Sequence, residues 1–385
     1  MNANGQLDHG ERAARTVLSA LIEPGDPNVM RRVDVAGAKA TLRAIRKGDI
    51  KLDPNHRMRD RLRTCPPDGD ELLAAAERLG IGYLCPGEAG WPAALDTMRE
   101  TLDAGADAVP PPLGLWWRGD ADLAPAVESA VAVVGSRNAS RYGERVAADL
   151  GSDLAMAGWT VVSGAAFGID AASHRGALAM GGTTVAVLAC GVDVAYPKSH
   201  AGLLERIAAQ GVVLSEMPPG TRPMRSWFLA RNRIIAALSA GSVVVEAALR
   251  SGALSTAGWA TKLSREVLAV PGPVTSALSA GCHDLVREKG ATMVTDARDV
   301  VDAVGALGAD AVPARRGEDR PFDRLTPVQR RLREAMVAGR TTTVAMLVEA
   351  TGLAAATVRE AMGELDGSGW VEEDGDGWRL PRGGP

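Results

Sequence analysis

The chain has 385 residues, 46% apolar and 23% charged, with a net charge of −4 at neutral pH. This length predicts two or three domains, and the acidic balance excludes a protein coated in positive charge for nonspecific DNA binding, while leaving room for a local basic groove. The sequence shows neither an apolar run of membrane-spanning length nor a signal peptide, so we expect a cytoplasmic protein that does not enter a membrane. The cysteines Cys65, Cys85, Cys190 and Cys282 lack metal-ligand spacing, and we expect no metal and no cofactor.

Residues 1–80 are predicted to form a small helical, SAM-like domain, because apolar residues recur at helical spacing in three stretches between residue 11 and about residue 78. Between two of these stretches Arg57, Arg59, Arg61 and Arg63 alternate with other residues. Such a run can touch a phosphate backbone, but it is more often a solvated face.

Residues 81–305 are predicted to form an extended Rossmann-like domain. Its first part, up to residue 122, is rich in proline and ends in GLWWRGD, which is apolar enough to pack on a sheet as an extra strand. Seven aliphatic strands then alternate with amphipathic helices, namely VAVV, TVV, TTVAVL, VVLSE, SVVVEA, EVLAV and TMV. This alternation is typical of an α/β doubly wound, mostly parallel sheet that helices cover on both faces.

Two of these strands end in glycine where a helix is about to begin. The first turn contains Gly135, Ser136 and Arg137, and the second spans residues 164–170. Glycine lets backbone N–H groups at a helix N-terminus approach a phosphate closely, and the carboxyl ends of parallel strands share one edge of the sheet. The sequence therefore predicts a phosphate-facing edge here.

The segment 226–235 places Arg231 and Arg233 on either side of an asparagine at the start of a helix, close to Phe228. Arginine offers a planar set of donors for phosphate, and an aromatic ring can stack on a base. We expect the two guanidiniums to converge with that of Arg137 over the edge of the sheet. The alternative is that one arginine pairs structurally with an acidic side chain.

Residues 306–322 have the composition of a linker, and residues 323–385 read as three short helices followed by a hairpin around DGDG. This order predicts a winged-helix domain. Its third helix carries Glu360, Glu364 and Asp366 against one Arg359, so we expect a protein contact or an accessory role more than DNA readout.

Taken together, these motifs resemble the DNA-processing protein DprA (Smf) family. The resemblance rests on VAVVGSR, SGAAFGIDAASHRGAL, GGTTVAVLACGVDVAYP, LSEMPPG, RNRIIAALS and VVVEAALRSGALSTA in this order. It implies a bacterial cytoplasmic protein that binds single-stranded DNA, forms a homodimer through its Rossmann-like domain and helps to load RecA recombinase during natural transformation.

The resemblance also implies which residues meet DNA. Carried over motif by motif, the DNA-binding positions are Gly135, Ser136, Arg137, Ser163, Gly164, Gly168, Lys198, Phe228, Arg231, Asn232 and Arg233. The family pairs through the late part of its sheet, where Cys282, Leu285 and Val286 give one predicted helix an apolar stripe. We expect this stripe to form the dimer interface.

The rival hypothesis is an enzyme, a nucleotide phosphoribohydrolase of the lysine-decarboxylase-like group. That group uses a Pro-Gly-Gly-x-Gly-Thr loop, whereas residues 251–256 here read SGALST. Asp170 and His174 lie four apart and are candidates for an acid–base pair, although a helix-capping Asp170 and a locally bonded His174 explain the spacing as well. We therefore expect a binding protein that is not an enzyme.

Overall fold

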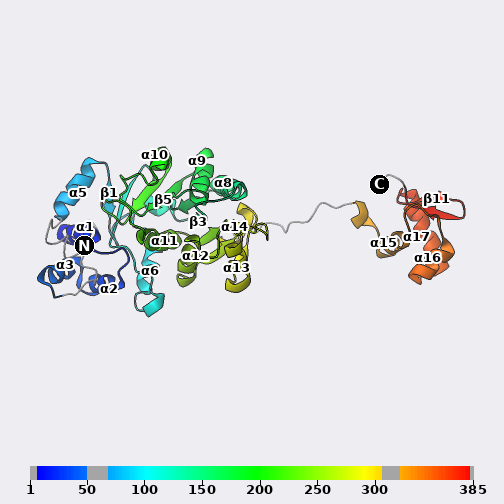
Figure 1. Ribbon diagram of the computed structural model, residues 1–385, viewed down its shortest axis with the longest axis horizontal. Helices are drawn as coiled ribbons and strands as arrows, with labels where there is room; N and C mark the ends of the chain where they lie inside the picture. The colour runs from blue at the N-terminus through cyan, green and yellow to red at the C-terminus, as the bar shows by residue number, and fades with distance from the viewer. Residues whose placement is uncertain (1–6, 50–67, 306–320, 382–385) are drawn as a thin grey trace. The chain divides into compact units, whose positions relative to one another are not determined.

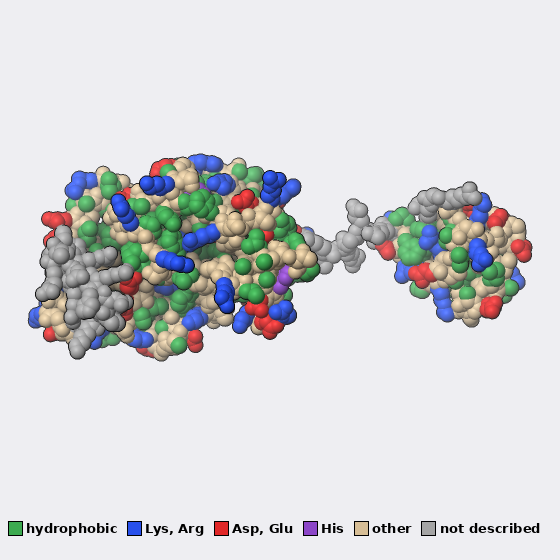
Figure 2. Space-filling model, viewed as in Figure 1, with side chains coloured by type: hydrophobic (Ala, Val, Ile, Leu, Met, Phe, Trp, Pro, Cys, Tyr) green, Lys and Arg blue, Asp and Glu red, His purple; other side chains and the backbone are tan. Residues whose placement is uncertain are grey.

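The computed structural model describes residues 7–49, 68–305 and 321–381, which belong to two compact units, residues 1–312 (unit 1) and residues 313–385 (unit 2) (Figure 1). The arginine run at residues 57–63, Cys65 and most of the predicted linker lie outside the described residues. On the face drawn in Figure 2, unit 1 carries both signs of charge, and the net charge of the whole chain is −4.

Unit 1 begins with the helices α1 (His9–Leu21), α2 (Pro27–Ala36), α3 (Ala38–Lys47) and α5 (Gly69–Arg78). Their ends are set locally, since the Asp26 carboxylate accepts from two amides at the start of α2 and Asp68 does the same for α5. The buried faces of α1 to α3 share one apolar cluster with Leu102 and Leu113. The helical front is therefore packed onto the following segment within one compact unit.

The proline-rich segment contributes two strands to the sheet. It contains β1 (Gly82–Leu84), η1 (Ala93–Leu95), α6 (Asp96–Glu100), η2 (Gly105–Asp107), β2 (Leu115–Gly119) and α7 (Leu123–Ala126). Strand β2 pairs antiparallel with β6, and Trp116 is completely buried. The predicted extra strand is thus confirmed.

The central sheet has nine strands in the order β1-β2-β6-β5-β4-β3-β7-β8-β9. The seven predicted strands are all present, as β3 (Ala130–Val134), β4 (Thr160–Ser163), β5 (Thr184–Leu188), β6 (Val212–Ser215), β7 (Gly241–Val244), β8 (Glu266–Ala269) and β9 (Thr292–Met293). These seven run parallel, with Val131 opposite Val161 and Val133 opposite Val243. The predicted fold class, a mostly parallel Rossmann-like sheet, is confirmed.

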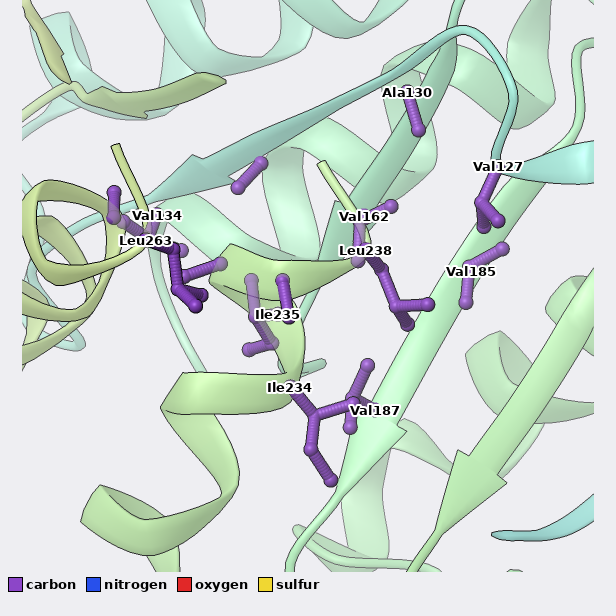
Figure 3. Packing of buried hydrophobic residues seen from close by; sticks show 14 of the residues in the cluster. Val127, Ala130, Val134, Val162, Val185, Val187, Ile234, Ile235, Leu238 and Leu263 are labelled. Carbon is purple, nitrogen blue, oxygen red and sulfur yellow. The ribbon is translucent and has the colours of Figure 1, made fainter. Parts of the chain in front are cut away.

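Helices cover both faces of this sheet, which is why its strands are apolar throughout. The helices are α8 (Arg141–Met156), α9 (Ile169–Ala179), α10 (Ala201–Gln210), α11 (Trp227–Ala237), α12 (Ala253–Lys262), α13 (Ala280–Lys289) and α14 (Ala297–Val304), with η3 (Lys198–His200) before α10. On one face Ile234, Ile235 and Leu238 point from the α11 segment toward Val185 and Val187 (Figure 3). On the other face, α8, α9 and α14 pack against the strand residues whose side chains point the opposite way, such as Val131 and Val133.

Helix α13 corrects the predicted dimer interface. Cys282 and Leu285 are buried in the apolar cluster of unit 1, because α13 turns its stripe toward the sheet. Only Val286 of the three is exposed, at 38%. Leu285→Glu would therefore bury a charge in the core and destabilise the fold instead of splitting a dimer.

The described part of unit 2 contains η4 (Pro321–Arg324), α15 (Pro327–Ala335), β10 (Thr342–Thr343), α16 (Val344–Thr351), α17 (Ala355–Gly367), β11 (Glu372–Asp374) and β12 (Gly377–Arg379). A capping box between Thr326 and Gln329 begins α15. Three helices and a hairpin follow one another as the sequence predicts, in the order expected of a winged helix. In neither unit does a described helix combine the length and the apolar character needed to span a bilayer.

Candidate nucleic-acid interface

The strand order reverses direction beside β3. From β3 the chain steps through β4, β5 and β6 to one side, and then α11 carries it back to β7 on the other side of β3. In open α/β sheets, ligands bind outside the carboxyl ends of the strands at such a reversal. The predicted turns after β3 and β4 lie at this place.

The two turns interlock. The amide of Ser136 donates to the Glu246 carbonyl at 2.7 Å, and the amide of Ile169 donates to the Ser136 carbonyl at 3.3 Å. Gly168 has φ of +72°, and a Cβ there would collide with the Ser136 carbonyl oxygen. Glycine is therefore required for the second turn to lie against the first.

The helix ends behind these turns are occupied by the protein's own carboxylates. Glu246 accepts from the Ser140 amide at 2.9 Å and from its hydroxyl at 2.6 Å, at the start of α8. Asp170 accepts from the amides of Gly164 at 3.2 Å and Ala166 at 3.4 Å. Burial raises the pKa of Asp170, which these amides and the charge of Arg231 partly offset.

These contacts restrict which amides near the two turns could hold a phosphate. The amides of Ser140, Gly164 and Ala166 already have carboxylate partners, and a second anion there would be repelled. A phosphate at this edge would therefore be met by exposed side chains and by turn amides other than these three. An acidic residue directly after an apolar strand, as in VVVEA, is the sequence signal that marks Glu246.

Arg233 is a structural residue in this fold. Its guanidinium makes a bidentate ion pair with Glu216, with both N···O distances 2.6 Å, and also donates to the Pro110 carbonyl at 2.7 Å. The residue is 1% exposed. The prediction that Arg233 holds a phosphate is wrong for this conformation, and the alternative of a structural pair with an acidic residue is what the structure shows.

Arg231 and Asn232 are also buried. Arg231 lies against Gly164 and donates to the carbonyls of Gly164 and Val187, while its Nε donates to the side-chain oxygen of Asn232 at 3.2 Å. Burial lowers the pKa of Arg231 to about 10. The two side chains fix the second turn to α11, and the expected convergence of three guanidiniums over the sheet edge does not occur.

The predicted DNA-binding positions thus divide into two groups. Ser163, Gly164, Arg231, Asn232 and Arg233 are buried, and the Ser163 hydroxyl donates to the Val133 carbonyl at 2.6 Å. Arg137 and Lys198 are exposed, and Gly135, Ser136, Gly168 and Phe228 are partly exposed. The second group is the one that solvent, and hence a ligand, can reach.

The exposed group includes a cation resting on an aromatic ring. The guanidinium carbon of Arg137 lies 4.6 Å from the centroid of the Phe228 ring. Tyr196, which is 41% exposed and which the sequence reasoning missed, lies on the same ring with 5.3 Å between centroids. We call Arg137, Tyr196, Lys198 and Phe228 the rim. A strand of alternating phosphates and bases matches this mixture of cations and rings.

His174 and Asp170 do not form the acid–base pair of the enzyme hypothesis. The Thr184 hydroxyl donates to the Val161 carbonyl, so His174 Nδ1–H donates to the Thr184 oxygen at 2.7 Å. His174 Nε2 is buried without a partner among the described residues. Burial lowers the pKa of His174 to about 3, so the ring is neutral and structural.

This buried histidine predicts a pH-dependent stability. Because the folded pKa of about 3 lies below the unfolded value of about 6.5, only the unfolded chain binds this proton as pH falls through that window. Stability should fall by up to about 1.4 kcal/mol per pH unit from this residue alone. In urea unfolding between pH 7 and 4.5, His174→Asn, which keeps a donor for Thr184, should show the shallower slope. Equal slopes would mean that the folded protein protonates His174.

Fold and rim define a Rossmann-like protein in which its own carboxylates hold the start of α8 and two amides of the second turn, and whose exposed edge offers cations and aromatic rings. The sequence profile of DNA recombination-mediator protein A matches residues 83–305, and the chain belongs to this family. The resemblance seen in the sequence is thereby confirmed. The family consists of recombination mediators, so the membership favours this hypothesis over that of a nucleotide phosphoribohydrolase.

One relative and one crystal structure agree with this membership. A Mycobacterium tuberculosis protein assigned as a DNA processing protein DprA is 41% identical over 95% of this chain and 94% of its own length. The crystal structure of DprA from Streptococcus pneumoniae is 30% identical, covers 78% of this chain and all of its own, and superposes with a TM-score of 0.62. A Helicobacter pylori DprA structure, which concerns that protein's single-stranded DNA binding mode, covers 58% of this chain at 28% identity and a TM-score of 0.49.

Proposed function

We propose that this chain binds single-stranded DNA along the rim and delivers the strand to RecA recombinase during natural transformation and recombination. The observation that carries the proposal is the exposed Arg137 guanidinium on the Phe228 ring, with Tyr196 beside it. Cations beside exposed rings are the means by which proteins hold unpaired strands without reading their sequence.

The chemistry of the rim favours an unpaired strand over a duplex. Stacking on Phe228 or Tyr196 needs an exposed base face, which a duplex hides. Lys198 and Arg137 add two exposed positive charges for the backbone. An ion-paired and buried Arg233 adds none, so affinity should depend on few phosphate contacts and moderately on salt.

The decisive experiment is a titration of the full chain with single-stranded and double-stranded oligonucleotides of equal length across a salt series. Preferential binding of the single strand, weakened by Phe228→Ala, supports the proposal. Tighter binding of the duplex would contradict it. Assembly of RecA on strands coated with a single-strand-binding protein, with and without this chain, tests delivery separately.

We also propose that the protein acts as a homodimer, paired through the end of the sheet formed by α13 and β9. Val286 is partly exposed there and Met293, on the last strand, is 56% exposed, so both can enter an interface. Val286→Asp with Met293→Asp should give a folded monomer in sedimentation experiments at micromolar concentration, while the parent sediments as a dimer. A monomeric parent refutes this pairing.

Unit 2 should contribute little to strand binding. Its third helix, α17, carries Glu360, Glu364 and Asp366, and Glu364 accepts from Gln329 at 2.7 Å. Such a helix offers almost no positive surface for phosphates. Deleting residues 321–385 should leave the single-strand Kd within a few-fold of the parent, measured by fluorescence anisotropy. A hundredfold loss would assign DNA contacts to unit 2.

A further inference from the structure

Phe167 is an exposed aromatic residue that the fold does not need for its core. It lies in the second turn, is 49% exposed and is absent from the apolar clusters of the described residues. A single exposed apolar side chain is common in proteins and by itself indicates nothing. Its surroundings are what distinguish it.

The backbone that carries Phe167 is fixed on both sides. Asp170 holds the amide of Ala166, and the left-handed Gly168 presses against the first turn. Ala165, at φ of +52°, accepts from the buried His200 ring at 3.0 Å, which fixes that ring in turn. The position of Phe167 is therefore set before any ligand arrives.

Among the residues that the structure describes, the ring of Phe167 has one aromatic partner. Its partner is His200, at 4.8 Å between centroids and 68° between planes, and His200 is itself almost fully buried. Half of the Phe167 side chain stays open to solvent. A rigid ring with a free face is the kind of platform on which bases stack.

One short segment links Phe167 to the rim. His200, which supports Phe167, ends η3, and Lys198 begins it. Tyr196, two residues earlier, contacts Phe228. The four steps along the chain from Tyr196 to His200 span at most about 14 Å. The exposed Phe167 and the partly exposed Phe228 thus contact the two ends of one segment, with the exposed Lys198 between them.

We propose that Phe167 is a second base-stacking position, so that a single strand runs from Phe228 past Lys198 to Phe167. One base stacks at each ring, and Lys198 holds a phosphate between them. This inference rests on the proposed single-strand binding. It adds the path that the strand takes across the loops that follow β4 and β5.

The test compares Phe167→Ala, Phe167→Leu and Phe167→Tyr in the full chain, with Met180→Ala as the control, since Met180 is an equally exposed apolar residue at the end of α9. With an oligothymidine long enough to reach both rings, Ala and Leu should each weaken binding by about 5- to 150-fold without changing the salt slope. Tyr and the Met180 variant should bind like the parent. Circular dichroism checks that each variant is folded.

Two further measurements make the result specific. A series of oligothymidines of increasing length should show no effect of Phe167→Ala for the shortest strands and the full effect once the strand reaches the second ring. In the second measurement, the fluorescent base 2-aminopurine replaces one base at a time along the strand, and its fluorescence is quenched where it stacks on a ring. One quenched position should become fluorescent in Phe167→Ala, and a different one in Phe228→Ala.

The outcomes separate this inference from the proposed function. If the parent binds no single strand, or Phe228→Ala has no effect, the proposed function itself fails. If Phe228→Ala weakens binding while Phe167→Ala binds like the parent at every length, only the second position is wrong. Restoration of binding by Phe167→Leu also overturns it, because leucine has no flat face for a base.

Discussion

Replacing Arg233 with alanine is expected to destabilise unit 1 by about 3–5 kcal/mol, because it leaves the buried Glu216 carboxylate without its counter-ion. The loss should appear as a fall in Tm of roughly 6–20 °C in a thermal scan. The expected result is a folding defect and not a selective loss of DNA binding, since the guanidinium donates to Pro110, Glu216 and Ala230 inside the protein.

The control for this prediction is Arg225→Ala, which removes an exposed arginine from the segment before α11 and should change Tm little. The double variant Arg233→Met with Glu216→Leu removes both buried charges and should recover part of the loss. If Arg233→Ala keeps the Tm of the parent but binds single strands more weakly, the structural role is contradicted and Arg233 contacts DNA after all.

Replacing Arg137 and Lys198 together is expected to weaken single-strand binding by on the order of tenfold for each lost phosphate contact. The slope of log K against log salt should become shallower by about 0.7 per contact, or about 1.4 for the pair. Both side chains are exposed, so the Tm of the double alanine variant should stay near that of the parent. The slopes can be compared by fluorescence anisotropy titrations at salt concentrations from about 50 to about 300 mM.

Arg331→Ala is the matched control for the loss of charge, because Arg331 is exposed and belongs to unit 2. It should leave both the affinity and the slope unchanged. Phe228→Ala should weaken binding with nearly the same slope as the parent, since stacking releases few counterions. A double variant of Arg137 and Lys198 with the full salt slope would place the phosphates elsewhere on the protein.

The sequence by itself determined the sheet and its edge. A run such as VAVVG has apolar residues on both sides of the strand, and only a sheet covered on both faces buries them, so the strands could be predicted from local pattern. Gly135 and Gly168 mark the turns for the same local reason, because backbone conformation and close approach are properties of single residues. Family membership also followed from the order of these motifs.

Only the tertiary structure decided which arginines face the solvent. Residues 231–235 of α11 are buried all round, so the helical pattern carries no sign of an outer face, and Arg231 and Arg233 could be read as ligand-binding. Their partners come from remote parts of the chain, with Pro110 lying 123 residues from Arg233. The same holds for Cys282 and Leu285, whose stripe faces the core. Hydrophobic spacing reports that a face is buried, whereas the partner that buries it, protein or ligand, is settled by long-range packing and charge pairing.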